Sequence, residues 1–181
     1  MNRPIAIYQS IFVLLSLAVA TLVESAPLAS LHVTRSVEIN LKPNQAWEIV
    51  RDFSSLHHWH PGFANTELTQ GPNGRVGAVR VASMAKGPRI SDELLQYSEQ
   101  SKSYRYRMVA SSLPYENYVG TISVQGKGTT SIVTWKASFK RKGSVTSVTD
   151  ADVILMNDHL VNVGLANLKR IADNEIGRAH V

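Results

Sequence analysis

The feature that most constrains the fold is a broad apolar stripe at helical spacing near the C-terminal end of the chain. Between about Thr149 and Asp173, apolar residues recur every three or four positions, which predicts one long amphipathic helix. A helix of this kind buries its stripe against another layer of the same domain. The stripe comprises Val153, Met156, Leu160, Gly164, Leu168 and Ile171, flanked by Ile154, Val161 and Leu165.

The other layer is predicted to consist of strands. Period-2 alternation from Leu31 to Ile39 predicts a half-buried first strand, and Arg35 falls on its apolar face, either at a rim or in a polar cavity. Pro43 suits the first turn of a short helix, and a second short helical segment runs to Trp59. About six strands follow before the long helix, which is the order of an α+β domain. A two-residue turn at 127–128 is expected to set Gly120 opposite Trp135.

The composition fits a single globular domain and excludes several chemistries. The chain has 181 residues, of which 44% are hydrophobic and 18% charged. Because it has no cysteine, it has no disulfide, thiolate metal site or cysteine nucleophile. Its formal net charge of +5 is spread thinly, and no nucleic-acid-binding motif accompanies it. The sequence also has no P-loop, dinucleotide fingerprint or Gly-x-Ser-x-Gly elbow, which argues against hydrolase chemistry.

We expect both ends of the chain to lie outside the domain. Residues 1–25 carry a lone positive charge at Arg3 and then an apolar core, which predicts a signal peptide cleaved after Ser25. An uncleaved membrane anchor is the alternative, although polar residues interrupt the apolar span. Residues 176–181 match the translation of a common sequencing adapter, and we interpret them as a non-native tail. The prediction is a periplasmic or secreted protein with one domain at 26–175 and no stable membrane span after cleavage.

Several short motifs occur in a fixed order along the mature chain. They are the segments 43–53, 59–61, 76–80, 90–95, 104–106, 114–118 and 134–135. Together they resemble the START-like helix-grip superfamily, specifically its polyketide cyclase/dehydrase branch (SRPBCC), over about residues 31–173. The signal peptide and the Pro-Tyr-Glu-Asn-Tyr segment make the chain similar to the periplasmic methanol-oxidation accessory proteins of this branch.

The resemblance implies an α+β helix-grip fold. In that fold a curved antiparallel β-sheet wraps around a long C-terminal helix, two short helices follow the first strand, and a cavity lies between sheet and helix. We predict no cofactor. The resemblance says little about chemistry, because this fold hosts lipid carriers, cyclases, hormone receptors and assembly factors.

Arg80 and Glu93 are the first candidate site. A two-residue turn at Lys86-Gly87 would set them directly opposite each other. If they face the cavity, they can bind a carboxylate or carbonyl group, or act as an electrophile and a general base. The alternative is a cross-strand ion pair on the solvent side. Alternation along the strand does not decide between the two, and the resemblance favours the cavity.

Aromatic residues expected on the inner face are the second candidate. Their phenol and indole groups can orient a mostly apolar ligand, and plain core packing is the alternative. Packing fits Trp135 and Tyr104 better, whereas Tyr106 and Tyr118 fit pocket lining better. The set comprises Trp59, Tyr104, Tyr106, Tyr118 and Trp135.

The histidines of 57–60 are the third candidate. On a helix His57 and His60 share a face, but His58 points away and the ligand set stays incomplete, so no metal site is predicted. We expect His60 instead at the cavity mouth, where it would titrate near neutral pH. The predicted ligand-binding residues are Trp59, His60, Arg80, Glu93, Tyr106, Tyr118 and Trp135.

Three functions fit these features. The favoured one is an exported, non-catalytic protein that binds a hydrophobic small molecule or lipid, or that assists a periplasmic redox system as an accessory protein. The second is a cyclase or isomerase in which Glu93 or His60 is the base and Arg80 stabilises an enolate oxygen. The third is a docking module for a periplasmic dehydrogenase or cytochrome, steered by basic residues on the outer sheet face. These basic residues are Arg105, Arg107, Lys136 and Lys140.

Overall fold

Residues 29–179 of the computed structural model form a seven-stranded antiparallel sheet, three helices and their connections. The strands are β1 (Leu31–Ile39), β2 (Phe63–Gln70), β3 (Val79–Met84), β4 (Arg89–Ser98), β5 (Ser103–Ser111), β6 (Tyr115–Lys127) and β7 (Thr130–Arg141). The helices are α1 (Pro43–Val50), α2 (Leu56–Trp59) and α3 (Asp150–Ala179). The predicted signal peptide lies outside the described residues, as do the last two residues of the predicted tail.

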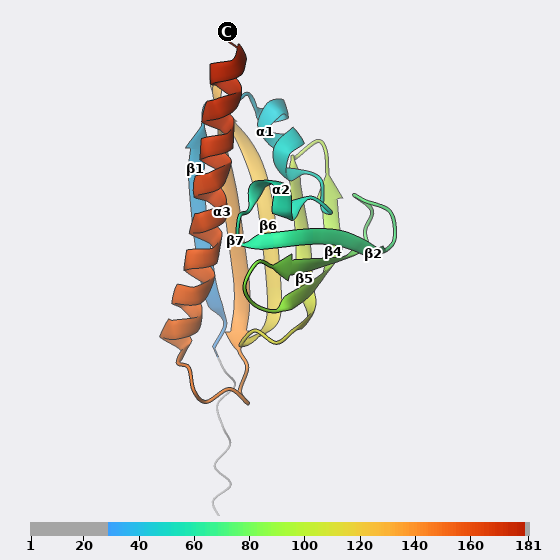
Figure 1. Cartoon of the computed structure of the whole chain (residues 1–181), viewed down its shortest axis with the longest axis vertical. Helices are drawn as coiled ribbons and strands as arrows, with labels where there is room; N and C mark the ends of the chain where they lie inside the picture. The colour runs from blue at the N-terminus through green and yellow to red at the C-terminus, as the bar shows by residue number, and fades with distance from the viewer. Residues whose placement is uncertain (1–28, 180–181) are drawn as a thin grey trace, which may run out of the picture.

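The sheet is curved and holds α3 along the long axis of the molecule (Figure 1). Its strand order is β1-β7-β6-β5-β4-β3-β2, so β1 and β2 are the edge strands. Helix α3 packs mainly on β1, α1 packs on β6 and β7, and α2 packs between β2 and α3. This arrangement confirms the predicted helix-grip fold.

Local sequence explains where α3 begins and which face it buries. Thr149 Oγ1 accepts a hydrogen bond from the Asp152 backbone N–H at 3.2 Å, and the Asp152 carboxylate accepts one from the Thr149 N–H at 2.8 Å. These reciprocal bonds satisfy donors that a helix start leaves free. The predicted stripe faces the sheet, although Met156 is 42% exposed. The helix continues past the predicted end at Asp173 as far as Ala179.

The β6–β7 hairpin turns one residue later than predicted. Gly128 and Thr129 form its centre, and Gly128 has a φ of +63°, which glycine adopts without strain. Gly120 therefore lies opposite Ala137, and the prediction that it lies opposite Trp135 is wrong. Because the pairing shifts by two residues, every side chain keeps its predicted face.

Between β3 and β4 the Met84 N–H donates to the Pro88 carbonyl at 3.3 Å, so residues 85–87 form a three-residue turn in place of the predicted two-residue turn. Arg80 consequently lies opposite Asp92, while Glu93 lies opposite Val79. A one-residue change of register exchanges the inner and outer partner. The predicted pairing of Arg80 with Glu93 is wrong for this reason.

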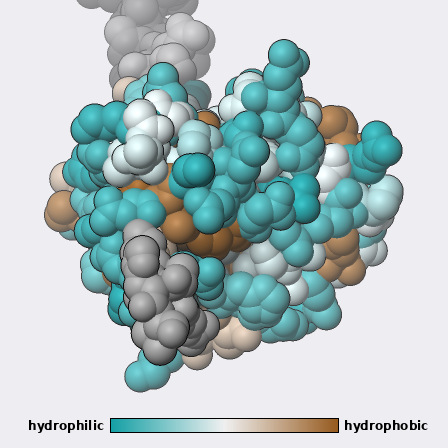
Figure 2. All heavy atoms as spheres, turned by 90° about the horizontal axis from the view of Figure 1, so that it is seen from above, coloured by the Kyte–Doolittle hydropathy of each residue, from teal (hydrophilic) through white to brown (hydrophobic). Residues whose placement is uncertain are grey.

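The face of the domain seen from above is mostly hydrophilic. Hydrophobic residues show in a recess near the centre of this face (Figure 2). No helix within residues 29–179 combines the length and apolar character that crossing a bilayer requires.

Candidate ligand-binding cavity

A cavity lies between the inner face of the sheet and α3. Strands β3 to β7 and α3 each direct a polar side chain to its wall, because alternation along each strand and the helical period bring these positions inward. Much of the rest of the lining is aliphatic or aromatic. The polar lining residues are Arg80, Asp92, Tyr106, Tyr115, Tyr118, Trp135 and Asn157.

An ion pair between Arg80 and Asp92 forms the charged part of this wall. Nε of Arg80 donates to Oδ2 of Asp92 at 3.0 Å, and Nη1 donates to the Phe53 carbonyl at 3.0 Å. Nη2 of Arg80 lies 2.9 Å from the same Asp92 oxygen and completes the ion pair. The guanidinium carbon lies 4.2 Å from the ring centre of Phe53 and 4.9 Å from that of Tyr106. The charge of Arg80 is thus already balanced within the protein.

The second carboxylate oxygen of Asp92 is free. Asp92 is only 3% exposed, and within residues 29–179 its Oδ1 has no hydrogen-bond partner. Burial raises the pKa of the Asp92 carboxyl, and the guanidinium of Arg80 opposes that rise. An unpaired buried oxygen is costly, so this atom is a ready acceptor for a hydrogen-bond donor that enters the cavity.

Tyr118 and Asn157 connect the sheet to α3 across the cavity. Nδ2 of Asn157 donates to the Tyr118 hydroxyl at 3.2 Å, while Oδ1 of Asn157 is buried without a partner in the described part of the chain. The indole N–H of Trp135 is also buried and unpartnered there. Burial raises the pKa of Tyr118 to about 12, so its phenol is neutral at physiological pH.

The cavity is small in this arrangement of side chains. Its volume is about 20 Å³, which is enough for about one water molecule. Met108, Leu113 and Leu160 line it and are half-buried, so each of these side chains contacts both the cavity and the surface. Such flexible side chains change rotamer readily, and an occupant larger than water must displace them.

His60 packs between α2 and α3. Its Nδ1 accepts a hydrogen bond from the Gly62 N–H at 3.0 Å, so the neutral ring carries its proton on Nε2, which donates to the Leu160 carbonyl at 2.9 Å. Burial lowers the pKa of His60 to about 4. The expectation that His60 lies at the cavity mouth and titrates near neutral pH is therefore wrong.

The predicted site residues separate into three places. Trp59 and His60 are buried behind the cavity wall, with the Trp59 ring centre 5.6 Å from that of Trp135. Glu93 lies on the opposite face of the sheet, where it accepts a hydrogen bond from Arg107 at 2.6 Å. The residues that the structure brings together at the cavity are Arg80, Tyr106, Tyr118 and Trp135.

Two cavity residues with an unpartnered oxygen in the described part of the chain, Asp92 and Asn157, were not predicted as site residues, although each has a signal in the sequence. Asp92 alternates in phase with Ile90 along β4, which places it on the buried face. Asn157 stands four residues after Val153 and four before Val161, so it is a polar residue within the apolar stripe of α3. A polar side chain at a position that the pattern assigns to the core is the common signal.

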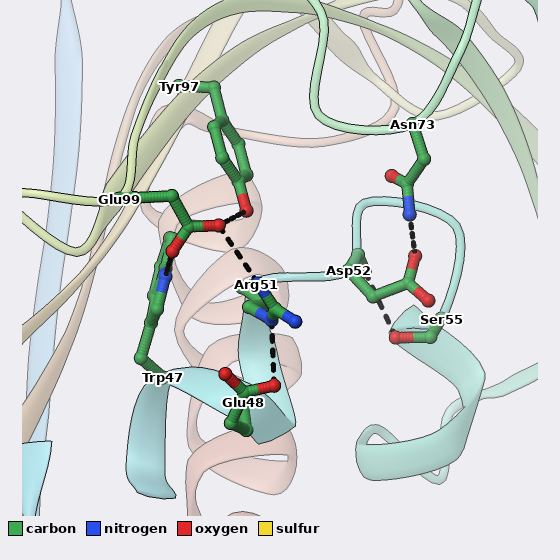
Figure 3. Close-up of polar contacts among 8 residues, drawn as sticks. All are labelled: Trp47, Glu48, Arg51, Asp52, Ser55, Asn73, Tyr97 and Glu99. Atoms are coloured by element: carbon green, nitrogen blue, oxygen red, sulfur yellow. Dashed lines mark hydrogen bonds and ion pairs between the residues drawn. The ribbon is translucent and has the colours of Figure 1, made fainter. Parts of the chain in front are cut away.

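A second polar cluster lies on the surface, where α1 approaches the β4–β5 hairpin (Figure 3). Glu99 accepts hydrogen bonds from the Trp47 indole, from the Tyr97 hydroxyl at 2.6 Å and from Arg51 at 3.0 Å. Arg51 also pairs with Glu48 at 2.9 Å. Arg51, Tyr97 and Glu99 also border an open surface pocket of about 620 Å³. The polar groups of these three residues are already engaged with one another.

The histidine-rich segment does not assemble a metal site. The rings of His57 and His58 lie 4.1 Å apart, whereas His60 is turned into the core. Among the side chains of the described residues, no three histidines, aspartates or glutamates come together in a metal-binding group.

Comparisons with known proteins agree with this fold. XoxI from Bacillus cereus is 30% identical, with a TM-score of 0.70 over 78% of this chain and 94% of that one. An uncharacterised protein from Bacillus thuringiensis is 29% identical, with a TM-score of 0.69 over 78% of this chain and 98% of that one. Ginseng major latex-like protein 151 from Panax ginseng is 18% identical, with a TM-score of 0.66 over 79% and 97%. The last likeness concerns the fold alone.

The sheet, the gripped helix and the interior cavity define a helix-grip protein of the SRPBCC type. The family model described as "Polyketide cyclase / dehydrase and lipid transport" matches residues 30–173. The chain belongs to this family.

Proposed function

We propose that this protein is an exported binding protein that holds a small, mostly apolar molecule between the sheet and α3. The proposal rests on a set of buried polar atoms of Asp92, Trp135 and Asn157 that have no partner within residues 29–179, all lining one largely apolar cavity. Proteins rarely leave such atoms unpaired, and a ligand with matching groups supplies the missing hydrogen bonds. The family description, which includes lipid transport, agrees with an apolar cargo.

Binding requires the cavity to enlarge. At about 20 Å³ it is far smaller than the interior of a loaded carrier, since small-molecule pockets typically measure about 300 Å³ or more. Outward rotation of Met108, Leu113 and Leu160 would open it from the surface side. These side chains come from β5, the β5–β6 connection and α3, so opening needs no change in strand pairing.

We favour binding over cyclase or isomerase chemistry because neither expected base faces the cavity. The Glu93 carboxylate pairs with Arg107 on the outer sheet face. Both ring nitrogens of His60 are already hydrogen-bonded. Arg80, the expected stabiliser of an enolate oxygen, is paired with Asp92.

Export to the periplasm is part of the proposal. It rests on the signal-like pattern of residues 1–25 and on the resemblance to periplasmic methanol-oxidation accessory proteins. Expression of the full chain in a bacterial host should yield a periplasmic protein whose N-terminal residue is Ala26. Recovery of the uncleaved chain from the cytoplasm would contradict export.

Native mass spectrometry of the mature protein tests the binding function. The protein purified from a periplasm should carry an extra mass that is lost on denaturation. Leu113→Trp places a large side chain at the cavity and should abolish that mass, whereas Val109→Trp on the exposed side of β5 should retain it. A clean apo mass, together with no thermal stabilisation by small added alkylbenzenes, would overturn the proposal.

Docking on an acidic partner is a second candidate function, favoured by the charge of the outer sheet face. Arg105 on β5 and Lys136 on β7 flank Thr121 in register, and both are exposed. Neither takes part in an ion pair among the described residues. The partner, on the resemblance, would be a periplasmic dehydrogenase or cytochrome.

Salt dependence tests this second candidate. Binding to the partner should weaken as ionic strength rises, and Arg105→Glu with Lys136→Glu should weaken it further. Lys86→Glu, in the exposed β3–β4 connection, is the matched control and should have little effect. Salt-insensitive binding would count against electrostatic docking.

A further inference from the structure

The unpartnered atoms of the cavity are mostly hydrogen-bond acceptors. Oδ1 of Asp92 and Oδ1 of Asn157 are acceptors, and the Trp135 indole contributes one donor. Asp92 is the most informative of these residues, because its Oδ2 is held by a hydrogen bond and an ion pair with Arg80 while its Oδ1 accepts no hydrogen bond from residues 29–179. An ionised carboxylate oxygen can only accept, so the group that satisfies it must donate.

The charge of the cavity wall is already balanced. Arg80 and Asp92 form a pair at 2.9 Å, with side chains 1% and 4% exposed. A ligand carboxylate would find the guanidinium occupied and would lie beside the free oxygen of Asp92. Burying such an unpaired anion is very costly. The wall therefore excludes an anionic headgroup.

We propose that the ligand is an uncharged molecule with an apolar skeleton and one hydroxyl or N–H group that donates a hydrogen bond to Asp92. The inference rests on the proposed binding function and specifies its ligand class. It replaces the carboxylate or carbonyl ligand expected for an Arg80–Glu93 site.

The size and position of the cavity agree with this class. About 20 Å³ next to Asp92 accommodates a group the size of water, which is also the size of a hydroxyl. The apolar skeleton then extends toward Met108, Leu113 and Leu160, the half-buried side chains of the lining. The polar end thus lies deep and the apolar body lies toward the surface.

Three probes that share one ring test the ligand class on the wild-type mature protein: 4-ethylphenol, 4-ethylanisole and 4-ethylbenzoate. Dissociation constants are measured by isothermal titration calorimetry, with NMR titration for weak binding. The phenol should bind about ten-fold more tightly than its methyl ether, because only the phenol satisfies the Asp92 oxygen. Burial of apolar area alone predicts the reverse order, since the ether has an additional methyl group. The benzoate should not bind.

A pair of neighbouring variants tests which carboxylate recognises the donor. In Asp92→Asn the amide oxygen can accept the hydrogen bond from Arg80, and the amide NH₂ then faces the cavity. Because this NH₂ cannot accept a hydrogen bond from the ligand, the preference for the phenol over the ether should fall about ten-fold. Glu93→Gln makes the same chemical change one residue later on the outer face and should keep the wild-type preference. Circular dichroism establishes that each variant is folded, and the wild-type probe series remains decisive if Asp92→Asn is not.

Each outcome has a distinct meaning. Equal binding of phenol and ether, preference for the ether, or tight binding of the benzoate would overturn the ligand class while leaving the binding function intact. Binding of none of the three probes, with no co-purified ligand in native mass spectrometry, would overturn the binding function itself.

Discussion

The imidazole ring of His60 occupies the space beside Gly164 that any other residue would fill with its Cβ. A Cβ at Gly164 would lie 2.5 Å from Cδ2 and 3.0 Å from Nε2 of that ring. The same ring donates to the Leu160 carbonyl one turn earlier in α3 at 2.9 Å. Helix α2 can therefore approach α3 this closely only because residue 164 is a glycine.

Gly164→Ala should destabilise the protein by about 1–3 kcal/mol, the usual cost of overpacking a core. The loss is expected although alanine has the better helix propensity by about 1 kcal/mol. In a His60→Ala background, the same substitution should be neutral or stabilising, because the ring is gone. Urea unfolding of the four variants measures this coupling. Equal costs in both backgrounds would show that His60 does not cause the strain.

The stability of the protein should depend on pH through His60. Burial lowers the pKa of His60 from 6.5 to about 4, so between these values the unfolded chain binds the extra proton. The contribution of the neutral ring is fully present above pH 6.5 and falls by up to about 3 kcal/mol as the pH drops to about 4. His60→Gln should flatten the stability profile over this window, whereas His58→Gln, at an exposed position, should not. Parallel wild-type and His60→Gln profiles would contradict the assignment.

The two partners of the buried ion pair should not be equally costly to remove. Asp92→Leu leaves a guanidinium that cannot lose its proton, and should cost about 3–5 kcal/mol. Arg80→Met should cost less, because Asp92 can become protonated and burial already raises its pKa. Combining the two substitutions should recover part of the loss seen in Asp92→Leu. Unfolding free energies at pH 7 test the order, and a smaller cost for Asp92→Leu would refute it.

The α+β order of elements could be predicted because it depends on patterns that are local in sequence, whereas the helix-grip arrangement was expected from the resemblance to a known superfamily. Alternation identifies which residues of β5 and β7 are buried, and the stripe from Val153 to Ile171 identifies the helix that the sheet holds. The registers could not be predicted as well, because they depend on the length of each connection. In the β3–β4 hairpin, one additional residue in the turn at 85–87 changes the cross-strand partner of Arg80. In the β6–β7 hairpin, the turn is centred one residue later than predicted, and every side chain stays on its predicted face of the sheet.

The site was harder to predict because two neighbouring carboxylates, Asp92 and Glu93, look equivalent in the sequence. Only the register decides that Asp92 enters the core and that Glu93 pairs with Arg107 outside. Alternation identified Tyr106 as inward-facing. It did not identify Gly120 as the residue that leaves space for the Tyr106 ring because it has no side chain. A Cβ at Gly120, directly opposite on β6, would collide with the Tyr106 ring.

The location of a bound probe distinguishes a ligand site between the sheet and α3 from a surface site. The experiment adds 4-ethylphenol to the mature protein with labelled methyl groups and records intermolecular nuclear Overhauser effects. We expect contacts from the probe to the methyl groups of Met108, Leu113 and Leu160, which line the cavity. Contacts confined to the exposed methyl groups of Val76 or Val109, or no contacts at all at saturating probe, would contradict a ligand site between the sheet and α3.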